Sequence, residues 1–339
     1  MLRRSLLLVI LAALALVPAA VADGGGPSPG VSEGWDGVTN ASGELRYVSV
    51  PADTGTVVEA IRTLDGRVLQ FNAAAGSFGV PIVAQDGTPG GLSADGKTLV
   101  LADGTPGNPL RTVSKFLVYD ARQLQNGPAE FELAGDFSFD ALSPHGRTLF
   151  LIQHVNQQDV TRYVVRAYDL QQGRVLPQRI ADRTQKGWVM QGYPMTRATS
   201  ADGRFVYTLY QNPGGYPFVH ALDTVTMTAH CVGVPWRGGS DQAALWNVRL
   251  ALRDHGRQLA LNWRSGRPYL AIDTRTYRIS RPHAAFPWAP ALGGSLGGAV
   301  LLLLVATLVL RRRRRGGPGG EFEAFLREQA EHSRTAVGA

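Results

Sequence analysis

The sequence predicts an all-β fold built from repeated units of four short strands. A tight turn containing glycine recurs five times along the chain and leads each time into an apolar strand; the turn glycines are Gly43, Gly96, Gly146, Gly203 and Gly256. Successive turns are separated by 53, 50, 57 and 53 residues. A four-stranded unit cannot bury both faces of its sheet alone, so it packs face to face with its neighbours. Units of this size are typical of the blades of a β-propeller.

A second marker follows each glycine turn, where a strand ends in a turn that begins with aspartate. The five residues are Asp65, Asp120, Asp169, Asp223 and Asp273. Aspartate at this place favours a hairpin because its side chain can bond to the backbone of the turn. In the second unit we expect strands near residues 90–93, 97–102, 116–119 and 129–133. Five units predict five blades, and six or seven remain open if the long connections contain degenerate blades.

Three of the repeated stretches are close to one another: "LSADGKTLVLAD" from Leu92, "LSPHGRTLFLIQ" from Leu142 and "TSADGRFVYTLYQ" from Thr199. They resemble the TolB-like and WD-repeat-like propellers of exported bacterial proteins, whose blades carry an S-P-D-G turn before an aliphatic strand. The resemblance covers residues 37 to about 282. The last unit, "LRDHGRQLALN", lacks the serine, and the first unit lacks the aspartate. The resemblance implies a fold rather than a function, because propellers include enzymes, scaffolds and receptors.

The N-terminus has the pattern of a secretory signal peptide. Arg3 and Arg4 precede an apolar run, and residues 20–22 offer the small-x-small pattern of a cleavage site. The mature chain is therefore expected to begin near Asp23. We divide the exported part into a linker at residues 23–36 and a propeller ectodomain at residues 37–287.

The C-terminal region has the pattern of a single membrane span. Residues 291–310 contain no charge, and about 20 apolar residues are enough for a helix to cross the bilayer core. Five arginines follow at residues 311–315, which places that end on the cytoplasmic side, and Trp288 stands where an interfacial aromatic residue belongs. We predict a membrane helix at residues 288–310 and a cytoplasmic tail at residues 311–339. The protein would then be a type I, single-pass protein of the bacterial plasma membrane, with the lipid bilayer as one partner.

The basic net charge of +7 reflects these topology signals more than a basic surface. Arginines at both ends of the chain supply most of it, so the exported body is nearly neutral and no nucleic-acid partner is expected. The single cysteine, Cys231, excludes an internal disulfide. It follows His230 in an apolar strand, where a buried, unreactive thiol is the default.

Long connections between units are rich in aromatic residues. Propellers usually bind ligands on the face formed by the connections between blades and by the loops from the second to the third strand. The candidate ligand-binding residues on that predicted rim are Trp188, Tyr193, Tyr216, Trp236 and Trp246. Tyrosine and tryptophan combine apolar area with a polar group, which suits a surface for glycans or proteins. The alternative is that the same rings fill the inner strands and the blade interfaces.

The histidines show no pattern of a metal site. The sequence has no H-x-H or H-x-x-x-H pair and no carboxylate cluster with ligand spacing, so we expect no metal and no cofactor. Most of the histidines are interpreted as residues of blade turns or of the core. An enzyme remains the alternative: a lyase or hydrolase acting on a cell-wall glycan or peptide in the central tunnel, with His154, Asp140 and His220 as candidates.

The motif "GGSLG" at residues 293–297 matches the nucleophile elbow of hydrolases, but it lies inside the predicted membrane span, where no α/β sheet can present it. The same stretch contains two small-xxx-small pairs that let two membrane helices approach closely. The residues of this candidate dimer contact are Gly293, Gly294, Gly297 and Gly298. A glycine facing lipid without a partner is the alternative.

The function favoured by these patterns is a non-catalytic sensor or interaction propeller at the cell surface. Its partner would be an extracytoplasmic protein or glycan, and a homodimer through the membrane helix is possible.

Overall fold

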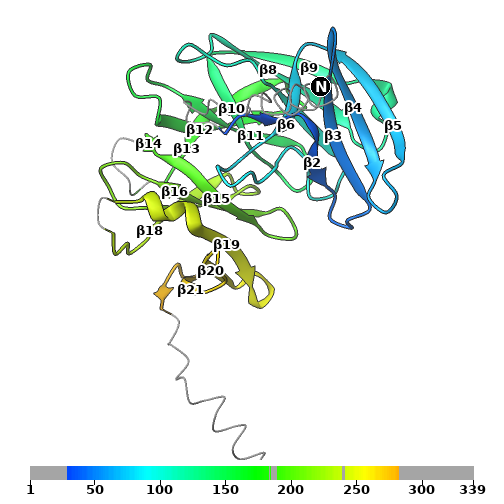
Figure 1. Cartoon of the computed structure of the whole chain (residues 1–339). Coiled ribbons are helices and arrows are strands. Elements are labelled where there is room, and N and C mark those ends of the chain that lie inside the picture. Colours follow the sequence, from blue (N-terminus) through cyan, green and yellow to red (C-terminus); the bar gives the residue numbers. More distant parts are fainter. Residues whose placement is uncertain (1–28, 183, 185–188, 239–240, 282–339) are drawn as a thin grey trace, which may run out of the picture. The chain divides into compact units, whose positions relative to one another are not determined.

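The structure is a computed structural model, and it describes residues 29–182, 184, 189–238 and 241–281 (Figure 1). These residues form five antiparallel sheets that follow one another along the chain. Every sheet has four strands connected in sequence order, and two of the sheets carry one additional short strand. Over the described residues, the five four-stranded units predicted from the repeated turns are confirmed, and they agree with a propeller.

The first sheet consists of β2 (Gly34–Thr39), β3 (Leu45–Ala52), β4 (Gly55–Arg62) and β5 (Val68–Ala75). The second consists of β6 (Phe78–Pro81), β7 (Thr98–Asp103), β8 (Val113–Asp120) and β9 (Ala129–Ala134), with β1 (Val31–Ser32) paired to β6 and the 3-10 turn η1 (Leu124–Asn126) before β9. The third consists of β10 (Asp136–Leu142), β11 (Thr148–His154), β12 (Arg162–Asp169) and β13 (Arg174–Ile180), with β14 (Met190–Gln191) paired to β12.

The fourth sheet consists of β15 (Tyr193–Thr199), β16 (Phe205–Gln211), β17 (Phe218–Asp223) and β18 (Thr228–Gly233). The fifth consists of β19 (Val248–Arg253), β20 (Gln258–Trp263), β21 (Pro268–Asp273) and β22 (Ile279–Ser280). Two further 3-10 turns, η3 (Ala243–Asn247) and η4 (Asp254–Gly256), lie before and after β19.

Each inner sheet is apolar on both faces because it is packed between two neighbours. In β7, Leu99 and Leu101 belong to the buried cluster shared with the first sheet, whereas Val100 and Ala102 belong to the cluster shared with the third. This is the two-residue alternation of a strand with both faces covered. Among the described residues, four large buried clusters join consecutive sheets, and none of the four combines the first sheet with the fifth.

The repeated glycine turn connects the first strand of a sheet to its second strand, as predicted. Gly96 has a φ of 68°, and its N–H donates to the carbonyl of Ser93 at 2.9 Å. The Ser93 hydroxyl accepts the N–H of Thr98 at 3.0 Å, which fixes the start of β7. Ser143 and Ser200 accept the corresponding N–H groups in the third and fourth sheets, at 3.0 and 2.8 Å. Serine and glycine recur because one supplies this cap and the other the left-handed conformation.

The fifth unit departs from this pattern because Arg253 replaces the serine. Its turn is the short 3-10 segment η4, in which Asp254 and His255 take positive φ values of 52° and 55°. The missing serine therefore corresponds to a different type of turn in the fifth unit. This turn still connects the first strand of the sheet, β19, to the second strand, β20.

The expected strand at residues 90–93 in the second unit is corrected by the structure. The innermost strand begins earlier, at β6, and is interrupted by residues 82–90 before Leu92 returns to pair with Leu99. Ile82 pairs with Pro89, so the inserted residues form a small loop that closes on itself. The sequence pattern identified only the part of the strand that follows this loop.

We call the inserted segment, residues 82–90, the crossing loop. It starts in the second sheet and contacts the fourth and fifth sheets rather than only the neighbouring third sheet. The N–H of Gln85 donates to the carbonyl of Pro194 in β15 at 2.8 Å, and the N–H of Asp86 donates to the carbonyl of Met195 at 3.2 Å. The Asp86 carboxylate also lies 3.6 Å from the Arg249 guanidinium on β19. The loop therefore links the second sheet to the innermost strands of the fourth and fifth sheets.

Strand pairing begins at Val31, inside the stretch expected to be a linker. The predicted signal peptide, the membrane helix at residues 288–310 and the cytoplasmic tail lie outside the described residues, as do Gly293, Gly294, Gly297 and Gly298. Within the part of the chain that the structure describes, no helix has the length and apolar character needed to cross a membrane.

Two glycines of the second unit should respond differently to alanine: Gly96 in the repeated turn, and Gly91, which precedes Leu92 in the innermost strand. Both have positive φ, but a Cβ at Gly96 would meet open space, whereas one at Gly91 would lie 2.4 Å from the Val100 carbonyl oxygen. We expect Gly96→Ala to lower the free energy of unfolding by about 1 kcal/mol from backbone strain alone. Gly91→Ala should lower it by about 3 kcal/mol, because steric overlap adds to the strain. Urea denaturation of both variants measures the difference, and equal losses would contradict it.

Candidate functional site

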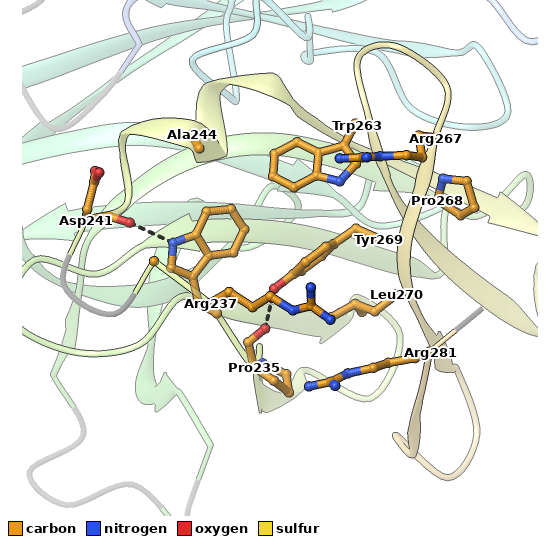
Figure 2. A pocket seen from close by; sticks show the side chains of 12 residues that line it. Pro235, Arg237, Asp241, Ala244, Trp263, Arg267, Pro268, Tyr269, Leu270 and Arg281 are labelled. Carbon is orange, nitrogen blue, oxygen red and sulfur yellow. Dashed lines mark hydrogen bonds between the residues drawn. The ribbon is translucent and has the colours of Figure 1, made fainter. Parts of the chain in front are cut away.

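A pocket of about 550 Å³ lies where the connection after β18 meets the fifth sheet (Figure 2). The connection supplies Trp236 and Arg237, and the β20–β21 hairpin supplies Trp263, Arg267 and Tyr269. Arg281, which follows β22, also lines the pocket and is labelled in Figure 2. The volume of the pocket is within the range of small-molecule sites. These six residues define the aromatic–arginine pocket.

Three aromatic rings form the wall of this pocket. The Trp236 ring centroid lies 6.0 Å from that of Trp263 and 5.4 Å from that of Tyr269, and the Trp263 and Tyr269 centroids are 5.4 Å apart. Trp236 is 9% exposed and belongs to the core cluster between the fourth and fifth sheets, and the other two rings are half-buried against it. The wall is thus an extension of the hydrophobic core that reaches the surface.

Two hydrogen bonds hold the rings in place (Figure 2). The Trp236 indole N–H donates to the carbonyl of Asp241 at 2.7 Å, and the Tyr269 hydroxyl donates to the carbonyl of Pro235 at 2.5 Å. The polar atoms of Trp236 and Tyr269 are thus satisfied by backbone groups, and the ring surface that a ligand can reach belongs mainly to the half-buried Trp263 and Tyr269. The tyrosine bond also ties the fifth sheet to the connection that leaves the fourth.

The polar side of the pocket is basic. Arg237, Arg267 and Arg281 are exposed and come from three separate segments of the chain (Figure 2). None of the three guanidinium groups forms an ion pair or a hydrogen bond with another residue that the structure describes. The Arg267 guanidinium carbon lies 5.9 Å from the centre of the Trp263 ring, within the range of a cation–π contact. Free guanidinium groups beside aromatic rings suit the recognition of an anion that also has an apolar face.

The structure places the predicted rim residues in different environments. Trp236 lines the pocket, and Tyr193 packs against the same core cluster. Tyr216 and Trp246 are exposed, at 67% and 50%, but they do not line the pocket. Trp188 lies outside the described residues. Of the four members of the aromatic set that the structure describes, only Trp236 belongs to this site, and its burial shows that it has a core role as well.

Each candidate residue of the enzyme alternative has a different structural partner. His154 Nδ1 lies 2.9 Å from a carboxylate oxygen of Asp136, which also contacts Arg111 at 3.2 Å. Burial alone would raise the pKa of Asp136, but the His154 hydrogen bond and the Arg111 charge outweigh it and lower the pKa to about 2. This arrangement is a buried ionic contact between the second and third sheets.

Asp140 and His220 lie in the interface between the third and fourth sheets. The Asp140 carboxylate is buried in an ion pair with Arg197 of β15, whose Nε also donates to the Thr208 hydroxyl at 2.9 Å. His220 Nδ1 lies 3.6 Å from the Cys231 sulfur. Burial lowers the pKa of His220 to about 4 and raises the pKa of Cys231 to about 12, so both groups are neutral near pH 7.

The described residues contain no group of three or more His, Cys, Asp and Glu side chains placed to hold a metal ion.

Comparison with known proteins gives similarity to solved structures only. No family model matches the chain, and no curated protein matches it. Among the similar structures, TolB from Acinetobacter baumannii is 13% identical, with 71% of this chain and 54% of that chain covered and a TM-score of 0.39. Hydrazine synthase from Kuenenia stuttgartiensis is 16% identical, with 69% and 75% covered and a TM-score of 0.38. The Cps50 (Swd1) β-propeller domain from Myceliophteria thermophila is 10% identical, with 75% and 74% covered and a TM-score of 0.42.

The chain spans about half the length of the Acinetobacter TolB that it matches. TM-scores of this size are too low to support a fold assignment, so the fold is assigned from the structure of this chain. The five consecutive four-stranded sheets carry that assignment.

Sequence reasoning missed most of the pocket. Trp263, Arg267 and Tyr269 stand in the stretch "WRSGRPYL" at residues 263–270, which joins the second and third strands of the fifth unit. Loops of this kind were expected to bind ligands, and this one carries an aromatic residue on each side of a glycine turn, so a signal was present. Arg281 had no such signal, because only the pairing of β22 with β21 brings the end of the sheet to the pocket.

Proposed function

We propose that the chain is a non-catalytic binding protein of the bacterial cell surface, in which the propeller is exported and tethered to the plasma membrane by one helix. Its partner is an extracytoplasmic protein or glycan. The observation that carries the binding role is the aromatic–arginine pocket, where two half-buried rings and three guanidinium groups lie together without internal ionic partners among the described residues. Tyrosine, tryptophan and arginine are the residues that most often dominate binding surfaces. Here they leave ring area, and guanidinium groups with no ion pair among the described residues, available to a partner.

Support for the tether comes from the sequence. An apolar N-terminal run with a small-x-small site and an uncharged stretch at residues 291–310 before five arginines are the pattern of an exported, single-pass protein. An epitope added after Ala339 should resist protease applied to spheroplasts, whereas the propeller should be digested or released. Digestion of the epitope in intact spheroplasts would contradict this orientation.

Crosslinking of the full-length protein in cells tests the binding role. We expect a defined extracytoplasmic partner to be captured, and Trp263→Ala to reduce that capture at least fivefold, because the variant removes one ring of the pocket wall. Trp246→Ala is the matched control, since Trp246 is exposed in the same region but does not line the pocket.

Equal capture by the wild-type protein and the Trp263→Ala variant would remove the pocket from the proposal. Self-crosslinks that disappear in a Gly297→Ile variant would instead support a dimer through the predicted membrane helix.

A further inference from the structure

The charge around the aromatic–arginine pocket is unbalanced. Arg237, Arg267 and Arg281 line it, and among the described lining residues Asp241 alone is acidic. One Asp241 carboxylate oxygen accepts the N–H of Ala243 at 3.1 Å, so that carboxylate is held within its own turn. The three guanidinium groups reach the pocket from three segments, which spreads positive charge around its rim (Figure 2). Such a rim matches a ligand with more than one anionic group.

The rings indicate what carries those anionic groups. Trp236 and Trp263 are tilted by 46°, and Tyr269 is inclined to them by 65° and 69°. A flat aromatic ligand is best held between parallel rings, whereas these rings present apolar faces in different directions. Successive puckered sugar rings have several C–H faces that can rest on such surfaces, while their hydroxyl groups stay in water.

We infer that the aromatic–arginine pocket binds an acidic glycan, a chain of sugar rings that carries carboxylate or phosphate groups. This inference rests on the proposed binding function and names its ligand class. The guanidinium groups bind the anions in paired hydrogen bonds, and the exposed parts of the Trp263 and Tyr269 rings, packed against the buried Trp236, hold the apolar faces of adjacent sugars.

Titration of the full-length protein in detergent tests this inference, with intrinsic tryptophan fluorescence as the signal because Trp236 and Trp263 line the pocket. Trigalacturonate carries a carboxylate on every ring, glucose 6-phosphate carries a phosphate, and maltotriose is neutral. We expect trigalacturonate or the sugar phosphate to bind and maltotriose to bind at least tenfold more weakly. Arg267→Gln should weaken binding of the anionic sugar about tenfold.

Arg264→Gln is the matched control, because Arg264 lies in the same hairpin turn and is exposed but does not line the pocket. This variant should bind as the wild type does. Trp263→Leu should lose the sugar while still unfolding in one cooperative transition, which separates lost recognition from lost folding. A stronger response to trigalacturonate than to glucose 6-phosphate would identify the carboxylate as the preferred anion, and the reverse would identify the phosphate.

Four outcomes would overturn the inference. Equal binding of maltotriose, unchanged in Arg267→Gln, would show a neutral glycan site and leave the proposed binding function standing. Binding of inorganic phosphate alone, unaffected by Trp263→Leu, would show an adventitious ion only. Binding of a hexaglutamate peptide but of no saccharide would show an acidic protein partner. If no probe binds, the inference fails. The crosslinking experiment in cells then tests the proposed binding function independently.

Discussion

Replacing Asp140 with alanine is expected to lower the free energy of unfolding by about 3–5 kcal/mol. Asp140 and Arg197 are both almost fully buried, and they form an ion pair between the innermost strands β10 and β15 of the third and fourth sheets. Removing the carboxylate leaves the guanidinium charge inside the protein with only the Thr208 hydroxyl and a backbone carbonyl as partners. Urea unfolding of the full-length protein, followed by tryptophan fluorescence, measures the loss.

Two comparisons separate the unpaired charge from a general effect of mutation. Asp65→Ala removes the acidic partner of an exposed pair with Arg62, so it should change stability far less. The double variant Asp140→Leu, Arg197→Met replaces both charges by apolar groups and should be more stable than Asp140→Ala. If the double variant is as unstable as the single one, shape rather than the uncompensated charge explains the loss.

His220 is expected to make the fold sensitive to mild acid. Burial lowers the pKa of His220 to about 4, whereas an unfolded histidine titrates near 6.5. Between these values the unfolded chain binds a proton that the folded chain excludes, so stability falls as the pH falls. The contribution of this group is about 3 kcal/mol between pH 6.5 and pH 4. Asp140 and Asp182 favour the protonated form, and Arg197 opposes it, but burial is the largest effect.

A His220→Phe variant should lose this pH dependence. Its free energy of unfolding should change less than that of the wild type between pH 6.5 and pH 4, and His220→Gln provides a second neutral replacement if Phe disturbs the contact with Cys231. The carboxylates that titrate in the same range are common to all three proteins, so the difference between the curves reports His220. Parallel stability curves for the wild type and the His220 variants would show that His220 is not the group responsible.

Asp136 acts in a separate pH range. Its pKa of about 2 in the folded state gives stability that is lost only as the pH falls from about 4 through about 2.

The repeated turns could be predicted because their chemistry is local. Ser93, Asp95 and Gly96 bond to one another and to the next two residues, so a few letters of sequence contain the whole turn. The same holds for the aspartate turns, in which the Asp169 carboxylate accepts the N–H groups of Gln171 and Gln172, the second and third residues after it. Counting these turns was enough to place five sheets.

The interrupted strand of the second sheet and the pocket depend on contacts between distant segments. The crossing loop is positioned by bonds to Pro194 and Met195, and its own residues contain no signal for that partner. Trp236 and Trp246 are ten residues apart in one aromatic stretch, yet one is buried and the other half exposed, because only Trp236 is covered by the fifth sheet. Aromatic content therefore indicated where a binding face would lie but not which rings would form a site.

The crossing loop bears on how this protein unfolds. In repeat architectures each unit contacts only its neighbours, so terminal units can melt separately. Here Gln85 and Asp86 connect the second sheet with the fourth and fifth, while no large buried cluster among the described residues joins the first sheet to the fifth. Because the loop bonds the second sheet directly to the fourth and fifth, we expect the last two sheets to unfold together with the second. The contact of the loop with β15 and β19 also joins segments that are far apart in the sequence. Such contacts form late in folding and raise the folding barrier, so we expect the propeller to assemble only after its C-terminal half has been synthesised.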